Sequence, residues 1–415
     1  MLAKLKFVFC LLILALITSL TKAQSIDSLD LKIGQMLLLG MPTNAVDSAV
    51  LQEVKLGKVG ALIYFEKNIP KTNSFVAFKK MSWTYQRAAA IPLLICIDQE
   101  GGKVNRLKEK YGFPRSITAA SIGKSRSLDS ARFYAEATAA TLAGLGINVN
   151  FAPTVDLAVN PDNTVIVKVE RAYSNNEDSV VMFAREVVKA HRKFGIITSL
   201  KHFPGHGSST VDTHFGVADV TNTWNEREIK PYKQLLKEGY VDGVMSSHIV
   251  NKNLEPKGYP GTLSTRVLDS LLRKVMGYDG VIFSDDMQMS AIDKNYGLGE
   301  SIKLAINGGI DILCFSNNIR QSKVRTVDTV HTIIRRLVAS GEIKKERIDQ
   351  SFKRIMKLKS KLKNDSEQLE LANAYAELTR LKKLNQEYID QLAVSMPDKK
   401  KIKKRHKELL AKTKK

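Results

Sequence analysis

Short apolar runs alternate with longer amphipathic stretches along most of the chain. Eight runs have the length and composition of buried strands, at residues 33–40, 61–65, 93–98, 147–152, 197–202, 243–248, 280–284 and 310–315. The stretches between them can form crossover helices, as at 127–145 and 178–194, except for the first connection, which is short. Regular alternation of strands and helices predicts parallel pairing, and eight such units favour a single (β/α)8 barrel of the TIM type.

Polar side chains stand where several of these predicted strands end. Asp98, His202 and His248 end the third, fifth and sixth strands, and Asp285 directly follows the seventh. The active sites of TIM barrels are built at the carboxyl ends of the strands. An open, doubly wound sheet is the competing fold, but it would not spread site residues over so many consecutive strands.

The N-terminus has the pattern of a secretory signal peptide. Lys4 and Lys6 precede an apolar run at 7–17, and the small residues Thr21 and Ala23 follow. We expect residues 1–23 to be removed near Ala23 and the protein to be exported, to a periplasm or out of the cell. An uncleaved anchor is the alternative, although the run is short for a membrane span.

The remaining chain divides into a catalytic domain at 24–363, a helical extension at 364–396 and a basic tail at 397–415. The tail holds ten Lys or Arg residues and two acids, within a formal net charge of +22. Such a run is typical of a solvated tail or of contact with an anionic surface. We expect a monomer without a nucleic-acid partner. Beyond the signal, Cys96 and Cys314 lie in apolar runs and are expected to be buried free thiols.

The richest segment for chemistry is Lys-His-Phe-Pro-Gly-His-Gly at 201–207, followed by Asp212-Thr213-His214. These fourteen residues hold three of the seven histidines in the chain. A carboxylate two residues from an imidazole can orient it as a proton donor and acceptor near neutral pH. A metal site, or a loop held by buried histidine hydrogen bonds, is the alternative interpretation.

Carboxylates mark three further segments. Asp285 and Asp286 follow an apolar strand; Asp285 is placed to act as a nucleophile, whereas Asp286 fits a helix cap better. Asp98, before the Gly101-Gly102 turn, can accept two sugar hydroxyls. In the irregular segment after the fourth strand, we expect Asp156 to bond loop backbone, and Arg171 to reach a ligand or pair with an acid.

Three motifs in order make the chain resemble glycoside hydrolase family 3, in its N-acetylglucosaminidase branch. They are Asp-Gln-Glu-Gly-Gly at 98–102, the 201–207 segment with its Asp-x-His, and Ser-Asp-Asp at 284–286. The resemblance runs from about residue 33 to residue 363. The Gly-His-Gly and Asp-x-His pair separates this branch from β-glucosidases of the same family, which take an acid/base carboxylate from a second domain.

The resemblance implies a retaining β-N-acetylglucosaminidase without metal or cofactor. Its substrate would carry a non-reducing terminal β-linked N-acetylglucosamine, as in peptidoglycan fragments (muropeptides) or chitooligosaccharides. It implies Asp285 as the nucleophile, His214 as the acid/base and Asp212 as the partner of His214. The implied sugar-binding residues are Asp98, Arg106, Arg171, Lys201 and His202. The chain departs from the family at Lys103, where Arg is frequent, and at 166–170, which is longer than in compact members.

Two other functions compete with this one. The first is a β-glucosidase or an N-acetylglucosaminide phosphorylase on the same fold, because a histidine acid/base repels an incoming phosphate less than a carboxylate does. The second is a non-catalytic protein that binds sugar or cell wall through the basic tail.

Overall fold

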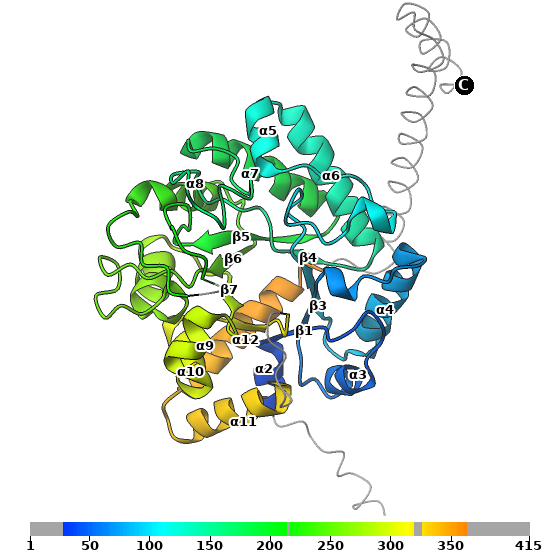
Figure 1. The fold of residues 1–415 in the computed structure, drawn as a ribbon. Helices are drawn as coiled ribbons and strands as arrows, with labels where there is room; N and C mark the ends of the chain where they lie inside the picture. The colour runs from blue at the N-terminus through cyan, green and yellow to red at the C-terminus, as the bar shows by residue number, and fades with distance from the viewer. Residues whose placement is uncertain (1–27, 214–215, 319–325, 363–415) are drawn as a thin grey trace, which may run out of the picture.

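A computed structural model describes residues 28–213, 216–318 and 326–362. The proposed signal peptide, the helical extension at 364–396 and the tail at 397–415 lie outside the described residues. Within them the chain forms one closed barrel of eight parallel strands, each paired with the next in sequence and β1 paired with β8. Helices surround the barrel (Figure 1). The predicted TIM-type fold is confirmed.

The strands of the barrel are short and buried. They are β1 Leu37–Gly40, β2 Ala61–Tyr64, β3 Leu94–Ile97, β4 Val149–Asn150, β5 Ile197–Phe203, β6 Gly243–Ser246, β7 Val281–Asp286 and β8 Ile312–Phe315. The helices are α2 Ser28–Gln35, α3 Ser48–Lys55, α4 Ser74–Ala88, α5 Ala119–Ser125, α6 Leu128–Gly144, α7 Glu177–Lys193, α8 Lys230–Lys237, α9 Ser290–Tyr296, α10 Leu298–Gly308, α11 Thr326–Ala339 and α12 Lys345–Lys359. Shorter or irregular helical segments are η1 Glu66–Asn68, η2 Glu109–Tyr111, η3 Glu226–Ile229, η4 Gly261–Leu263 and η5 Arg266–Val275.

All eight predicted strands are present, but their bounds differ from the prediction, most of all in the first and fourth strands. Residues 33–35 belong to α2, and burial does not show where this helix ends, because residues 33–40 are all buried. The fourth strand keeps only two of its six predicted residues. The short first connection also holds a helix, α3, whose N-terminus is capped by Asp47 through the amides of Ala49 and Val50.

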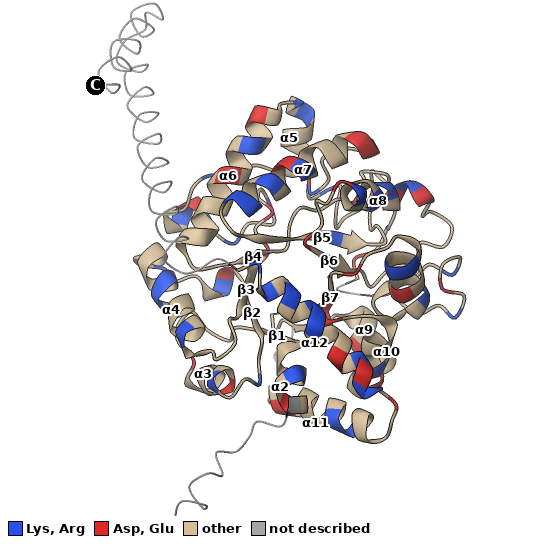
Figure 2. Ribbon diagram, turned by 180° about the vertical axis from the view of Figure 1, so that it is seen from behind, with Lys and Arg blue, Asp and Glu red and all other residues tan. Residues whose placement is uncertain are grey.

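The helix α12 covers the end of the barrel where the strands begin. At its start, Arg347 donates to the carbonyl of Ile310 (2.8 Å), just before β8. At its end, Lys359 donates to the carbonyl of Gly60 (2.9 Å), just before β2. Figure 2 shows α12 lying over the middle of the barrel. α12 does not cover the opposite end of the barrel, where the strands finish and where the candidate site residues lie.

The interior of the barrel is closely packed. Phe151 and Phe283 meet edge to face with ring centres 5.2 Å apart. Cys96 and Cys314 are free and buried, as predicted. In the part of the chain that the structure describes, no helix has the length and apolar character needed to cross a membrane.

Two irregularities interrupt the strand pairing. The register between β5 and β6 shifts after Leu200, and that between β7 and β8 shifts after Phe283. Such shifts re-aim side chains at the rim of a barrel. Lys201 and His202 lie within the first irregular stretch and Asp285 lies within the second, so the pairing is irregular at three candidate site residues.

Candidate active site

A cavity of about 180 Å³ opens at the carboxyl ends of the strands. Six of the sequence-predicted site residues line it: Asp98, Arg106, Arg171, Lys201, His202 and Asp285. Asp212 is not among the described lining residues, although its neighbour Thr213 is. His214 lies outside the described residues. The structure thus brings together residues separated by up to 187 positions in the sequence, from Asp98 to Asp285.

Asp98 is held by two cations. Its Oδ1 atom lies 2.8 Å from Nζ of Lys201, and its Oδ2 atom lies 3.6 Å from a terminal nitrogen of Arg106. Burial alone would raise the pKa of the Asp98 carboxyl, but Lys201 and Arg106 outweigh it and hold this pKa below its ordinary value. Asp98 is therefore a carboxylate at neutral pH, able to accept hydrogen bonds from sugar hydroxyls.

Glu100 is a site residue that the sequence analysis did not identify. Its Oε1 atom lies 2.6 Å from Nζ of Lys201 and 2.7 Å from Nη2 of Arg171, and its Oε2 atom accepts from Nε of Arg171 at 2.9 Å. Thr154 also donates to Oε2, at 3.0 Å. Arg171 thus pairs with an acid and also lines the cavity. The available signal was the position of Glu100 in the 98–102 motif, two residues beyond Asp98.

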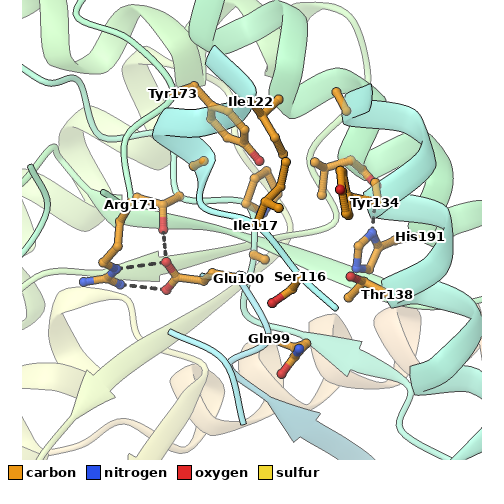
Figure 3. A pocket seen from close by; sticks show the side chains of 18 residues that line it. Gln99, Glu100, Ser116, Ile117, Ile122, Tyr134, Thr138, Arg171, Tyr173 and His191 are labelled. Atoms are coloured by element: carbon orange, nitrogen blue, oxygen red, sulfur yellow. Dashed lines mark hydrogen bonds and ion pairs between the residues drawn. The ribbon is translucent and has the colours of Figure 1, made fainter. Parts of the chain in front are cut away.

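The ion pair of Glu100 and Arg171 separates two hollows. Both residues line the cavity described above and also a smaller neighbouring pocket. Figure 3 shows this pocket, with the paired Glu100 and Arg171 at one side and Ile117, Tyr134 and Tyr173 among its other walls. The pair therefore forms part of the wall between the two hollows.

Hydrogen bonds set the proton position on His202. Its Nδ1 atom lies 2.7 Å from Oδ2 of Asp156, and its Nε2 atom lies 3.2 Å from Nη2 of Arg171. A carboxylate can only accept and a guanidinium can only donate. Nδ1 therefore carries the proton and Nε2 accepts from Arg171. Asp156 also accepts the backbone amides of His202 and His206, which confirms the predicted bonding of Asp156 to loop backbone.

The two adjacent aspartates of β7 have different surroundings. Asp285 lines the cavity, and its Oδ1 atom accepts the amide of Asp286 at 2.8 Å. Asp286 is buried; it accepts from the hydroxyl and amide of Ser316 and from the amide of Gln288. Asp286 therefore stabilises the turn after β7, but the predicted helix cap is wrong, because α9 begins only at Ser290 and Met289 precedes it. Both aspartates line the cavity, and Asp285 is the more exposed of the two.

His248 was predicted to end the sixth strand, but it lies two residues beyond the end of β6, and its hydrogen bonds give it a structural role. Its Nε2 atom lies 2.9 Å from the carbonyl oxygen of Asp286, and its Nδ1 atom lies 2.9 Å from the hydroxyl of Thr262. A carbonyl only accepts, so Nε2 carries a proton. His248 is not among the described residues that line the cavity. Its bond to the Asp286 carbonyl links the segment after β6 to the end of β7.

No group of three or more His, Cys, Asp or Glu side chains in the described ranges has the arrangement of a metal site. The described polar groups instead form hydrogen bonds and ion pairs with one another. Four carboxylates line the cavity: Asp98, Glu100, Asp285 and Asp286. Lys201 pairs with the first two, so the arrangement suits a neutral ligand rich in hydroxyls.

Comparison with protein families gives one match over most of the chain. A family described as "Glycosyl hydrolase family 3 N terminal domain" matches residues 28–358. This range includes all eight strands and every candidate site residue.

Similar proteins are named as β-hexosaminidases. The chain is 30% identical to "Beta-hexosaminidase A" of Pseudoalteromonas piscicida over 334 residues, which cover 76% of this chain and 56% of that protein. It is 31% identical over 287 residues to a "Beta-hexosaminidase" of Xanthomonas oryzae pv. oryzae, covering 67% and 82% of the two chains. The solved structure of a family 3 β-N-acetylglucosaminidase from Paenibacillus sp. str. FPU-7 superposes with a TM-score of 0.74 at 32% identity, covering 83% and 67%.

Proposed function

The chain belongs to glycosyl hydrolase family 3, and we propose on that basis that it is a retaining β-N-acetylglucosaminidase. The proposed substrate is a β-linked N-acetylglucosamine at the non-reducing end of a peptidoglycan fragment or a chitooligosaccharide. The observation that carries the proposal is that Asp285 lines the same cavity as Asp98, Lys201 and His202. The names of the similar proteins support the acetamido sugar.

The first chemical step in this proposal forms a covalent glycosyl-enzyme. An oxygen of Asp285 attacks the anomeric carbon while the bond from that carbon to the leaving oxygen breaks. His214 gives its proton to the leaving oxygen, and Asp212 holds the imidazole in the orientation that this transfer needs. Asp98 anchors the sugar through its hydroxyls.

The second step releases the sugar. His214 takes a proton from water as the water oxygen attacks the anomeric carbon, and the bond to Asp285 breaks with its electron pair returning to the carboxylate. Two inversions leave the configuration unchanged. Most retaining enzymes use two carboxylates for these tasks; here an imidazole paired with a carboxylate takes the place of one.

Hydrolysis of 4-nitrophenyl β-N-acetylglucosaminide beside the matching β-glucoside tests the reaction class. We expect a clear preference for the acetamido sugar and a first product with the β configuration, read by NMR before mutarotation. Preference for the glucoside would favour a β-glucosidase. Rates and products that depend on phosphate would favour a phosphorylase, and activity on neither sugar would favour a binding protein.

We also propose that the protein is exported after removal of residues 1–23. The support is the run of two lysines, an apolar stretch and small residues that precedes Gln24. Mass spectrometry of the N-terminus of the native protein tests this. A mature form that begins at Gln24 is expected, and a form that retains the apolar run would contradict cleavage.

A further inference from the structure

The segment at 204–209 connects two parts of the proposed site. It follows β5, which carries Lys201 and His202, and leads to Asp212. Side chains from the segment after β4 hold one side of it. Asp156 accepts the amide of His206 at 2.8 Å, and the Asn163 amide donates to the carbonyl of His206, also at 2.8 Å.

Glu228, from η3, holds the other side of this 204–209 segment. Its Oε2 atom accepts the amide of Gly207 at 2.8 Å, and nearby Trp224 donates to the carbonyl of Pro204 at 3.2 Å. The Glu228 side chain is completely buried. The 204–209 segment is thus fastened between two buried carboxylates, Asp156 and Glu228, which come from different elements.

The fit of the 204–209 segment against Glu228 requires glycine. A Cβ atom on Gly205, whose φ is +122°, would lie 2.5 Å from Cβ of Glu228. A Cβ atom on Gly207 would lie 1.9 Å from the carbonyl oxygen of Leu157 and 3.2 Å from Oε2 of Glu228. The backbone of the 204–209 segment therefore lies directly against the Glu228 side chain, with no room for a Cβ atom at either glycine.

The two carboxylates have opposite electrostatic environments. Burial acts to raise the pKa of Asp156, but His202 and the hydrogen bonds to His206 outweigh it, so Asp156 stays ionised. No cationic side chain among the described residues pairs with Glu228. Burial raises the pKa of Glu228 to about 7; the negative charge of Asp156 adds to this shift, and the hydrogen bond from the Gly207 amide opposes it.

The other groups near Glu228 do not change this picture. Burial raises the pKa of the Tyr232 phenol in α8 well above its ordinary value, and the charges of Asp156 and Glu228 add to this shift, so the phenol is neutral at pH 7. Burial also lowers the pKa of His206 to about 4, so this ring is neutral at pH 7. The adjacent Glu226 and Arg227 are exposed. Glu228 is therefore the group in this cluster that changes charge near neutral pH.

We propose that ionised Glu228 is a positioning residue that fixes the 204–209 segment, and through it the approach of the Asp212–His214 pair to the leaving group. This inference rests on the acid/base role given to His214 above. An ionised carboxylate accepts a stronger hydrogen bond from an amide than a neutral carboxyl does. Protonation of Glu228 would loosen the segment and weaken proton delivery, while the sugar-binding residues keep their partners.

The test compares Glu228→Gln with Glu226→Gln, a matched control on the same short helical segment. For each protein, kcat/KM is measured on aryl β-N-acetylglucosaminides from good leaving groups (dinitrophenyl) to poor ones (phenyl), between pH 5.5 and 8.5, which are about 1.5 units on each side of pH 7. For Glu228→Gln we expect a loss on the order of tenfold on the phenyl substrate, little loss on the dinitrophenyl substrate and a nearly unchanged KM.

The pH profile gives a second, independent readout. In the unaltered protein and in Glu226→Gln, activity on the phenyl substrate should fall as the pH drops below about 7, and this limb should disappear in Glu228→Gln. Equal losses on all leaving groups, or an unchanged limb, would overturn the inference. If Glu228→Gln does not fold, the unaltered protein alone provides the test. A kcat/KM on the phenyl substrate that does not change between pH 6 and pH 8 would then overturn the inference. Inactivity of the unaltered protein on every substrate would instead overturn the proposed function.

Discussion

Nζ of Lys201 lies 2.6 Å from Oε1 of Glu100, so a buried ion pair joins the end of β5 to the segment after β3. Arg171 contacts the same carboxylate oxygen at 2.7 Å. Burial acts to raise the pKa of Glu100, but Arg171 and Lys201 outweigh it and hold this pKa far below its ordinary value. Two cations thus share one buried anion, and together they support the neighbouring Asp98 and His202.

Replacement of Glu100 by Gln should therefore destabilise the protein strongly. It leaves Lys201 with one carboxylate, Asp98, and deprives Arg171 of its bidentate partner, which by analogy with other buried pairs costs about 3 kcal/mol of unfolding free energy. Urea denaturation measures this change. Glu66→Gln is the control, since Glu66 pairs with Lys108 and Lys110 at the surface and should change stability by less than about 1 kcal/mol. Similar small losses in both variants would contradict the buried network.

Asp98→Asn should impair the proposed reaction without unfolding the barrel. The amide keeps the shape of the side chain but removes the charge that binds Lys201 and, in our proposal, accepts sugar hydroxyls. Loss of charged hydrogen bonds predicts a decrease in kcat/KM on the order of 50-fold. Asp162→Asn is the matched control, because Asp162 is exposed and pairs with Lys168. A decrease no larger than that of the control would remove Asp98 from sugar binding.

His214→Ala tests the proton donor. A leaving group that needs protonation should lose about 1000-fold in rate, since general acid catalysis contributes factors of 100 to 10,000. A dinitrophenyl leaving group departs without a proton and should lose little. The measurement is the slope of log kcat/KM against the leaving-group pKa, which should become steeper in the variant. Parallel slopes in the two proteins would contradict the acid role.

Lys359 should make stability depend on pH. Its Nζ atom donates to Gln35 Oε1 (2.6 Å) and to the carbonyl of Gly60, and burial lowers its pKa to about 7. The unfolded chain binds this proton up to about pH 10, so the unfolded state holds more protons above pH 7 and stability rises there. The cost of the buried charge is therefore largest at low pH. The free energy of unfolding of Lys359→Met, minus that of the unaltered protein, should therefore be about 2 kcal/mol larger at pH 6 than at pH 9.

Urea denaturation of both proteins at pH 6 and pH 9 checks this prediction. Lys357→Met is a suitable control, because Lys357 is exposed on the same helix. A difference between the Lys359 variant and the unaltered protein that is the same at both pH values would show that this lysine keeps an ordinary pKa in the fold.

The parallel barrel and the general place of the site could be predicted because they depend on local patterns. Apolar runs mark the strands, and the polar residues stand at their carboxyl ends: Asp98 directly follows β3, and His202 and Asp285 are the next-to-last residues of β5 and β7. Boundaries were less accurate where burial is continuous. Ile33 and Met36 are both completely buried although only the run that follows is a strand, so hydrophobicity did not mark the end of α2.

Partners distant in sequence could not be predicted in this way. Glu100 lies 71 positions from Arg171, and no local pattern announces that pair. Glu228 lies 21 positions beyond Gly207, in a segment whose charged neighbours are exposed. Only the packing of η3 against the 204–209 segment buries this carboxyl group. By contrast, a bond from Asp156 to loop backbone was predicted, although its partner His206 was not. Pro and Asn residues around Asp156 indicate a rigid loop that needs backbone partners.

The central claim is that Asp285 forms a covalent bond with the anomeric carbon of an N-acetylglucosaminyl residue. The direct measurement is mass spectrometry of the protein, and of its peptic peptides, after incubation with 5-fluoro-N-acetylglucosaminyl fluoride, whose fluorine slows breakdown of the intermediate. We predict one added fluorinated sugar, located on the peptide that contains Asp285 and absent in Asp285→Asn. An adduct on another residue, or release of sugar by Asp285→Asn at the rate of the unaltered protein, would contradict the account.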